Sequence, residues 1–318
     1  MIPERRYDDT TLLFTTKVIT IARRDDHNPF FQIAAALNAW IMMQVLHWSP
    51  SETRLVQLDT GFPAATDALQ HQLLAPTRAV VTGQELVGKN VHFVGPVLLA
   101  PSEFSGPMMQ HLDDCEPCGD VDLIKSFRYA SLKAMNVSEE ETTNSTNFRV
   151  TIISRRNYNG RVIQRRWLNE DEVVKRMRID YAQYGIDFVS IDFVQLSMVE
   201  QMLTVLQSDV IIGMHGAGMA NVVWSRPDTL VVEIFPRLRR RWGFRNLCQF
   251  VGCDWHEFRQ GSDTGVGDNN SDKRIAYKHW DKFFKPLLMK AYERTGRTAQ
   301  DSNSQVANTS HVSIAPTS

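Results

Sequence analysis

The stretch Ser208–Pro236, SDVIIGMHGAGMANVVWSRPDTLVVEIFP, decides the fold because it joins two apolar strands through a glycine turn and a short helix. Val210–Met214 and Leu230–Phe235 are short and rich in β-branched residues, so we expect parallel strands buried on both faces. In an open α/β sheet, ligands lie at the carboxyl ends of strands, where glycines let a phosphate approach and the next helix offers unpaired N–H groups. The unit therefore predicts an anion site at His215-Gly216-Ala217-Gly218.

This turn is not diagnostic by itself. Its glycines do not form the dinucleotide fingerprint G-x-G-x-x-G, and no G-K-[ST] of a P-loop follows. The alternative interpretation is that the glycines only tighten a strand-to-helix turn and that His215 is a packed turn residue.

Composition indicates a soluble globular protein, with 318 residues, 43% hydrophobic and 22% charged, long enough for two domains. The 35 basic and 36 acidic residues leave a formal charge of −1, which argues against nucleic acid or a membrane surface as partner. The segment Arg237–Trp242 is a basic run with an aromatic residue, a pattern that also occurs in nucleic-acid-binding proteins. Because the protein as a whole is nearly neutral, we expect a solvated edge or a phosphate-facing loop there.

The cysteines and sequons bear on the compartment. Four cysteines (Cys115, Cys118, Cys248 and Cys253) allow two disulfides in three pairings, one zinc site, or buried thiols. The acceptor triplet Asn-x-Ser/Thr occurs at Asn136, Asn144, Asn269 and Asn308, which favours a secretory compartment without deciding it. No signal peptide is visible at the start, and the apolar stretch Phe30–Leu46 contains polar residues and predicts a buried core helix.

Residues 1–135 predict a first α/β domain. Its expected strands and helices are Lys17–Ala22, Phe30–Leu46, Thr53–Leu58, Ala64–Leu74, Val91–Leu99 as a strand pair or bent strand, and Val121–Met135. Residues 136–147 are polar and acidic without apolar periodicity, so we place a linker there.

Residues 148–295 predict a second, doubly wound domain in which strands and helices alternate. Strands are expected at Phe148–Ile153 and Ile186–Phe193. A capping box at Asn169 opens a helix before the second of these strands, and a capping box at Ser197 opens a helix before Val210–Met214. Arg274–Arg294 predicts a helix bent near Pro286, and residues 296–318 predict a disordered tail.

The strand ends of this domain bring the parts of a nucleotide site to one edge of the sheet, namely Ser154, Arg155, Arg156, His215, Gly216, Ala217, Gly218 and Glu233. An arginine there can neutralise a diphosphate, the turn N–H groups can bind its oxygens, and Glu233 can accept the ribose hydroxyls. We expect a β-branched residue at Gly216 or Gly218 to fill the phosphate space or to violate a positive φ. The alternative is a solvated strand end for the arginines and a surface edge position for Glu233.

Taken together, these motifs resemble glycosyltransferase family 61, whose inverting enzymes include plant core β-1,2-xylosyltransferase and protein O-GlcNAc transferases. The resemblance is carried by Ile153–Arg156, Gly160-Arg161-Val162, Arg166, Leu168-Asn169-Glu170, Met198…Glu200-Gln201, Ile212–Gly218 and Val231-Val232-Glu233. It is clearest over residues 148–258, while Ile19–Asp25, Asn28 and Phe30 resemble the xylosyltransferase branch more faintly.

The resemblance implies two Rossmann-like domains of the GT-B type, with a UDP-sugar in the cleft between them and a glycan or glycoprotein as acceptor. It implies inverting transfer of a pentose or GlcNAc without a metal, no cofactor beyond the donor, and the Golgi or endoplasmic reticulum lumen. No D-x-D motif lies near the predicted site, since Asp120-Val121-Asp122 falls between the domains. The family's usual signal anchor and longer N-terminal region do not precede the first strand here, so we expect a truncated N-terminal domain and no membrane contact except through such an anchor.

An inverting transferase needs a base that takes the acceptor's proton, and we expect it from the first domain. Asp25 is the chosen residue because it matches the acidic position of the xylosyltransferase-like segment, and His215 is the next candidate. Asp25, Asp26 and His27 have an alternative as ordinary cap and turn residues before a helix. A second function class stays open, a catalytically inactive relative that binds the nucleotide sugar without turnover.

Overall fold

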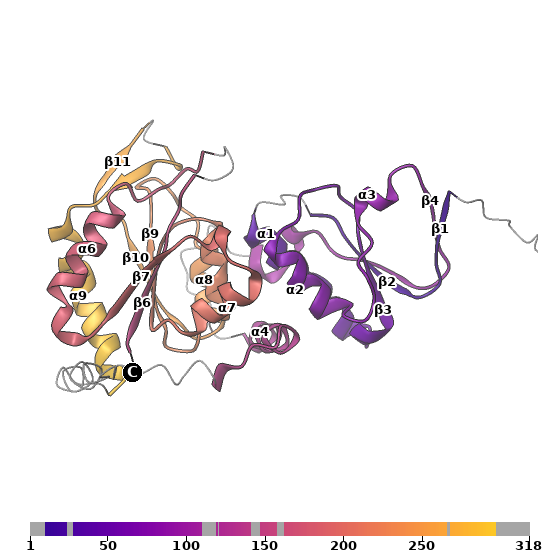
Figure 1. Ribbon diagram of the computed structural model, residues 1–318, viewed down its shortest axis with the longest axis horizontal. Helices are drawn as coiled ribbons and strands as arrows, with labels where there is room; N and C mark the ends of the chain where they lie inside the picture. The colour runs from indigo at the N-terminus through magenta and orange to yellow at the C-terminus, as the bar shows by residue number, and fades with distance from the viewer. Residues whose placement is uncertain are drawn as a thin grey trace, which may run out of the picture. The chain divides into compact units, whose positions relative to one another are not determined.

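A computed structural model describes residues 10–23, 28–109, 119, 121–140, 147–157, 162–265 and 268–296. The chain divides into two compact units, and Figure 1 labels many of their helices and strands. The first comprises Met1–Ser138, Leu196–Met202 and Arg241–Val251, and the second comprises Glu139–Gln195, Leu203–Arg240 and Gly252–Ser318.

The first unit contains two small parallel sheets. One has the order β3-β2-β5, with β3 at Thr53–Gln57, β2 at Lys17–Ile21 and β5 at Val97–Leu99. The other pairs β1 (Thr11–Phe14) with β4 (Asn90–Phe93). The stretch Val91–Leu99 is therefore two strands in different sheets, and β1 was not predicted at all. The helices of this unit are α1 (Pro29–Val45), α2 (Ala65–Leu74), α3 (Gly83–Leu86), α4 (Asp122–Ala134) and α8 (Gly243–Phe250).

Helix α1 is the core of the first unit, as its apolar composition predicted. Asn28 caps it, with its Oδ1 accepting from the Phe30 N–H at 3.2 Å, and Pro29 occupies the first turn. Its interior residues Ile33, Ala34 and Ala36 are fully buried. Among the residues that the structure describes, no helix combines the length and apolar character that a membrane span requires.

Two segments that the sequence placed in the second domain, Leu196–Met202 and Arg241–Val251, belong to the first unit. The second of them contains α8. The ring of Phe244 in α8 packs edge-on against Phe30 of α1, with centroids 5.4 Å apart. Near the start of α4, the Val121 N–H donates to the Phe250 carbonyl at 3.3 Å. These tertiary contacts hold α8 in this unit, and sequence order does not reveal them.

The second unit is built on a five-stranded, wholly parallel sheet of order β10-β9-β8-β6-β7. In chain order the strands are β6 (Arg149–Ile153), β7 (Asp187–Ile191), β8 (Val210–Met214), β9 (Leu230–Ile234) and β10 (Asp254–Phe258). The helices are α6 (Glu170–Asp180) and α9 (Tyr277–Arg294), while α7 (Met198–Leu206) begins in the first unit and ends in the second. Strand β11 (Ser262–Thr264) pairs antiparallel with β12 (Asp272–Arg274). The α/β class with parallel sheets is confirmed, and the second unit has the order of a doubly wound sheet.

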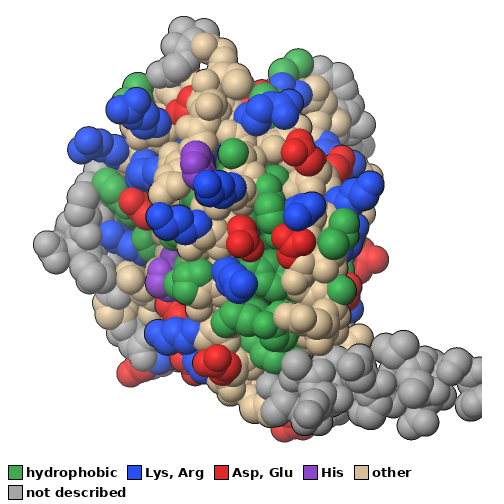
Figure 2. Space-filling model, turned by 90° about the vertical axis from the view of Figure 1, so that its left-hand side faces the viewer, with side chains coloured by type: hydrophobic (Ala, Val, Ile, Leu, Met, Phe, Trp, Pro, Cys, Tyr) green, Lys and Arg blue, Asp and Glu red, His purple; other side chains and the backbone are tan. Residues whose placement is uncertain are grey.

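Helices α6 and α9 cover one face of this sheet (Figure 1). Val174 and Met177 of α6 and Trp280 and Phe284 of α9 pack with the alternate strand residues that point to them, such as Ile212. The side of the molecule that carries these helices has basic and acidic side chains interspersed with apolar ones (Figure 2). Pro286 lies inside α9, which continues to Arg294.

The helix expected after the glycine turn is a 3₁₀ helix over Ala217–Trp224. It lies against the other face of the sheet, where a Cβ on Gly213 of β8 would be 2.5 Å from the sulfur of Met219. The absence of a side chain at Gly213 therefore permits this close packing.

The two predicted capping boxes have different outcomes. At Ser197, the Oγ accepts from the Glu200 N–H at 3.3 Å and Glu200 Oε2 accepts from the Ser197 N–H at 2.7 Å, so this box is confirmed. Asn169 stands at the N-cap of α6 but makes no capping bond with its side chain. Instead it clamps the backbone of Ile275, donating to the carbonyl at 2.9 Å and accepting from the N–H at 3.0 Å.

Candidate functional site

The order of the second sheet places two strand ends at its switch point. β6 and β8 are neighbours, while the chain between them makes β7 on the outer side of β6. Open α/β sheets bind ligands outside the carboxyl ends of the strands where the order reverses. Arg155 follows β6 and Gly216 follows β8, so both predicted groups lie at this point.

The Arg155 guanidinium lies directly over Gly216. A Cβ added to Gly216 would be 1.9 Å from Arg155 Nη1, and the guanidinium donates from Nε and Nη2 to the Gln164 carbonyl at 3.2 and 3.1 Å. The φ of Gly216 is 172°, which is extended backbone open to any residue, so the expected positive φ is wrong. The absence of a side chain at Gly216 lets the Arg155 guanidinium lie close to the backbone. At Gly218 a Cβ would meet only Ile153 Cγ2, at 3.2 Å.

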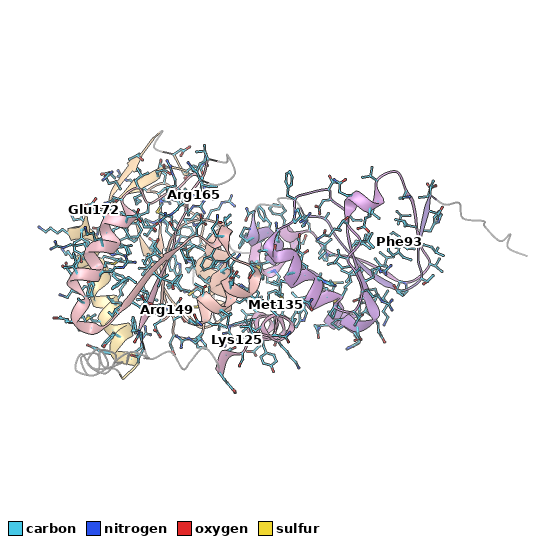
Figure 3. All side chains as sticks on the ribbon, viewed as in Figure 1. Phe93, Lys125, Met135, Arg149, Arg165 and Glu172 are labelled. Carbon is cyan, nitrogen blue, oxygen red and sulfur yellow. The ribbon has the colours of Figure 1, made fainter. Side chains whose placement is uncertain are left out.

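A further arginine, Arg165, was missed by sequence reasoning. Its Nε donates to the carbonyl of His215 at 2.9 Å and its Nη1 donates to Asn270 Oδ1 at 2.5 Å. Figure 3 shows Arg165 at the end of the sheet opposite Arg149, which begins β6. Its backbone has φ of 59°, a conformation that costs a non-glycine residue about 1–3 kcal/mol and often marks functional sites.

The next residue, Arg166, anchors this strained segment. Its N–H donates to Asp272 Oδ1 at 2.8 Å, and its Nη2 donates to Asp272 Oδ2 at 2.6 Å. The Lys273 N–H donates to the Arg166 carbonyl at 2.8 Å. Strand β12 therefore holds the backbone of Arg165 in place from about a hundred residues further along the chain, and no local sequence signal announces that contact.

Positive charge accumulates at this strand edge. Burial, and then the charges of Arg155 and Arg239, lower the pKa of Arg165 to about 10, although Asp268 opposes this. Arg165 therefore stays charged at neutral pH while it is repelled by its neighbours. A bound dianion would relieve this repulsion, which is the electrostatic signature of an anion site.

Glu233 does not fit its predicted role. Its side chain is completely buried, Oε1 lies 2.5 Å from His215 Nδ1, and Oε2 accepts from Trp255 Nε1 at 3.0 Å. Neither the ribose contact nor a surface edge position is compatible with this burial. The prediction failed because β10 pairs with β9 and covers what we had taken for an edge.

The arginine cluster consists of Arg155, Arg165 and Arg239. Arg156 makes its contacts with other residues. Its Nε donates to Ser154 Oγ at 3.2 Å and its Nη2 contacts Asp171 Oδ1 of α6 at 3.4 Å, with both ion-pair partners largely exposed. Ser154 is buried, and its N–H donates to the Ile191 carbonyl at 2.9 Å. Close by, Glu170 accepts from Ser190, and burial raises the pKa of Glu170.

The predicted base, Asp25, lies outside the described residues, as do Cys115, Cys118 and Asp120. In the described part of the first unit, Arg23 follows the end of β2, the strand that Asp25 also follows in the sequence. Its buried guanidinium pairs with Asp59 at 2.7 Å and with Asp67 at 3.0 Å, which is a structural role. The described side chains include no group of three or more His, Cys, Asp or Glu residues able to hold a metal ion.

A sequence model of the family Glycosyltransferase 61 matches residues 13–232. The chain is 27% identical over 121 residues to a beta-1,2-xylosyltransferase of Arabidopsis thaliana, covering 34% of this chain and 23% of that protein. It is 25% identical over 118 residues to an EGF domain-specific O-linked N-acetylglucosamine transferase of Mus musculus, covering 37% of this chain and 21% of that protein.

These matches span about a quarter of the length of the curated relatives. Among solved structures, the chain is similar to the E. coli heptosyltransferase WaaC with ADP, at a TM-score of 0.35 and 6% identity, covering 87% of this chain and 99% of that one.

Proposed function

The chain belongs to glycosyltransferase family 61, and on this premise we propose that it transfers a sugar from a UDP-sugar to a hydroxyl of a glycan or glycoprotein. The observation that carries the proposal is the Arg155 guanidinium over Gly216 at the switch point of the second sheet, next to half-buried Arg165. A diphosphate is the chemical group that such a cluster suits. The relatives named as xylosyl- and N-acetylglucosaminyltransferases support a pentose or GlcNAc as the sugar.

The transfer needs two charge movements. The acceptor oxygen forms a bond to the anomeric carbon as the bond from that carbon to the diphosphate oxygen breaks, so negative charge grows on UDP while the acceptor loses a proton. Preorganised positive groups stabilise such a leaving group, and removing one typically costs about 2.7–4 kcal/mol. Arg155 and Arg165, with Arg239 nearby, supply this charge from the protein, which supports a mechanism that needs no divalent ion.

The acceptor's proton goes to a general base, and attack opposite the leaving group inverts the anomeric centre. Asp25 stays our proposal for this base. If it is correct, Asp25→Asn keeps the wild-type affinity for UDP and lowers turnover by roughly 10²–10⁴-fold. Near-normal turnover of Asp25→Asn would remove Asp25 from the mechanism.

A donor panel tests the proposed function. We expect UDP-xylose, UDP-GlcNAc or UDP-arabinose to raise the melting temperature more than GDP-mannose. A ligand present at 100 times its Kd adds about 2.7 kcal/mol, which raises the melting temperature of a protein of this size by roughly 4 °C. Equal stabilisation by all donors, or by none, would refute the donor assignment. Binding of a UDP-sugar without hydrolysis or transfer to any acceptor would identify an inactive nucleotide-sugar-binding relative.

Two wider features belong to the same proposal. The doubly wound second unit supports a GT-B enzyme in which it binds the donor, with the first unit as the acceptor side. The exposed sequon residues Asn136 and Asn269 support residence in the lumen of the Golgi or endoplasmic reticulum.

A further inference from the structure

We propose that His215 and Glu233 together hold one extra proton at neutral pH, and that loss of this proton weakens diphosphate binding at the glycine turn. The inference rests on the proposed function, because it concerns how the same anion site is regulated. His215 directly precedes Gly216, so a change of charge on the pair acts on the turn immediately beside it.

Two hydrogen-bond arrangements fit the contact between His215 and Glu233. The His215 and Glu233 side chains are 5% and 0% exposed, so water cannot satisfy them. The indole N–H of Trp255 is always a donor, and it occupies Glu233 Oε2 at 3.0 Å. Glu233 Oε1 is therefore the oxygen that shares a proton with His215 Nδ1, across 2.5 Å.

The two arrangements differ by one proton. When Glu233 is ionised and His215 is neutral, Nδ1 carries the hydrogen, Nε2 carries none, and the buried pair has a charge of −1. When one more proton is present, the pair is uncharged overall and Nε2 carries a hydrogen, whether the shared proton sits on the carboxylate or on Nδ1. The second arrangement avoids a net negative charge in a site that excludes water.

The surroundings of Glu233 favour the protonated arrangement. Burial dominates and raises the pKa of Glu233 to about 8, and the neighbouring carboxylate Glu257 of β10 acts in the same direction. The Trp255 hydrogen bond and the charges of Arg259 and Arg239 oppose the shift without cancelling it. The Glu233 carboxyl therefore keeps its proton at pH 7 and releases it near pH 8.

Two cationic groups lie near His215, one over the Phe235 ring that His215 stacks on and one at the His215 backbone carbonyl. Its ring stacks on Phe235 with centroids 4.9 Å apart, and the Arg259 guanidinium lies 4.4 Å from the other ring's centroid. The His215 carbonyl accepts from Arg165 Nε. These cations belong to the same electrostatic environment as the arginine cluster, so a negative charge on the pair would offset part of the attraction that the cluster exerts on a diphosphate.

Linkage gives the expected size of the effect. A bound diphosphate repels the deprotonated pair and thus raises its pKa. If that increase is one unit above 8, UDP affinity falls about fivefold between pH 7 and pH 9. A larger coupling gives a larger fall.

The test compares the wild type with Glu233→Gln by calorimetry with UDP at pH 7 and pH 9. Trp255 orients the new amide, because its N–H needs the amide oxygen, and the NH₂ group then donates to His215 Nδ1. Glu233→Gln therefore keeps the hydrogen-bond arrangement of the protonated pair at both pH values. We expect the wild type to lose about fivefold more affinity than the variant over this range. Since UDP's own ionisation acts equally on both proteins, the comparison cancels it.

Equal pH dependence in the two proteins would overturn the inference and leave the proposed function standing. Failure of UDP to bind the wild type at either pH would instead refute the proposed function. Should Glu233→Gln fail to fold, nitrogen NMR of the histidine-labelled wild type decides. A hydrogen on His215 Nε2 at pH 7 that is lost near pH 8 supports the inference, and its absence at pH 7 overturns it.

Discussion

Replacing Gly216 with alanine tests whether the glycine turn acts through Arg155. The new methyl carbon would stand 1.9 Å from Arg155 Nη1 and 2.5 Å from its Cζ, so the guanidinium must leave its place. The backbone itself has no reason to move, because φ of 172° suits alanine. The substitution therefore displaces a charged group without deleting it and without straining the chain.

The magnitude follows from the lost contact. A charge-assisted hydrogen bond to an anion is worth about 1.5–3 kcal/mol, so we expect UDP to bind roughly 10–150-fold more weakly to Gly216→Ala. The melting temperature should change little, because the atom that moves is the end of a flexible, half-buried side chain.

Calorimetry with UDP on a double-mutant cycle of Gly216→Ala and Arg155→Ala gives the decisive measurement. If the alanine acts by moving Arg155, it has no further effect in the Arg155→Ala background, and the coupling energy equals the whole single-mutant effect. Gly218→Ala is the matched control, since its Cβ meets only Ile153 Cγ2 at 3.2 Å. Additive losses in the cycle, or equal losses for the two glycine variants, would refute the reasoning.

Three further predictions concern Arg165, the ion pairs of Arg23, and the pair of His215 and Glu233. Arg165→Gln should weaken UDP binding by at least about tenfold, whereas Arg156→Ala should cost less than Arg155→Ala because Arg156 contacts Ser154 and Asp171; calorimetry that ranks Arg156 first would contradict this. Asp59→Asn should lower the free energy of unfolding by about 2–4 kcal/mol in urea, because it leaves the buried Arg23 with one carboxylate, Asp67; a loss under about 1 kcal/mol would make the pair incidental. The free energy of unfolding of the wild type should fall by up to about 2 kcal/mol as pH rises from about 6.5 to 8, because folded His215 and Glu233 keep their extra proton to about pH 8 while an unfolded histidine releases it near 6.5. Glu233→Gln should lack this pH dependence, and parallel stability curves for the two proteins would contradict the prediction.

The sequence by itself determined the local elements of the second unit. Apolar β-branched runs predicted β8 and β9, the glycines marked the turn after β8, and Ser197 with Glu200 predicted a cap that the structure contains. The motifs also predicted the family. These signals succeed because strand propensity, capping and turn chemistry depend on residues close together in the chain.

Only the tertiary structure decided how the site is assembled. The order that makes β6 and β8 neighbours puts Arg155 over Gly216, although about sixty residues separate them. Arg165 reaches the site through a left-handed backbone held by Asp272, and Glu233 is buried because β10 covers β9. The physical reason is the same in each case: strand order and side-chain pairing depend on contacts between distant segments, whose free energy no short stretch of sequence carries.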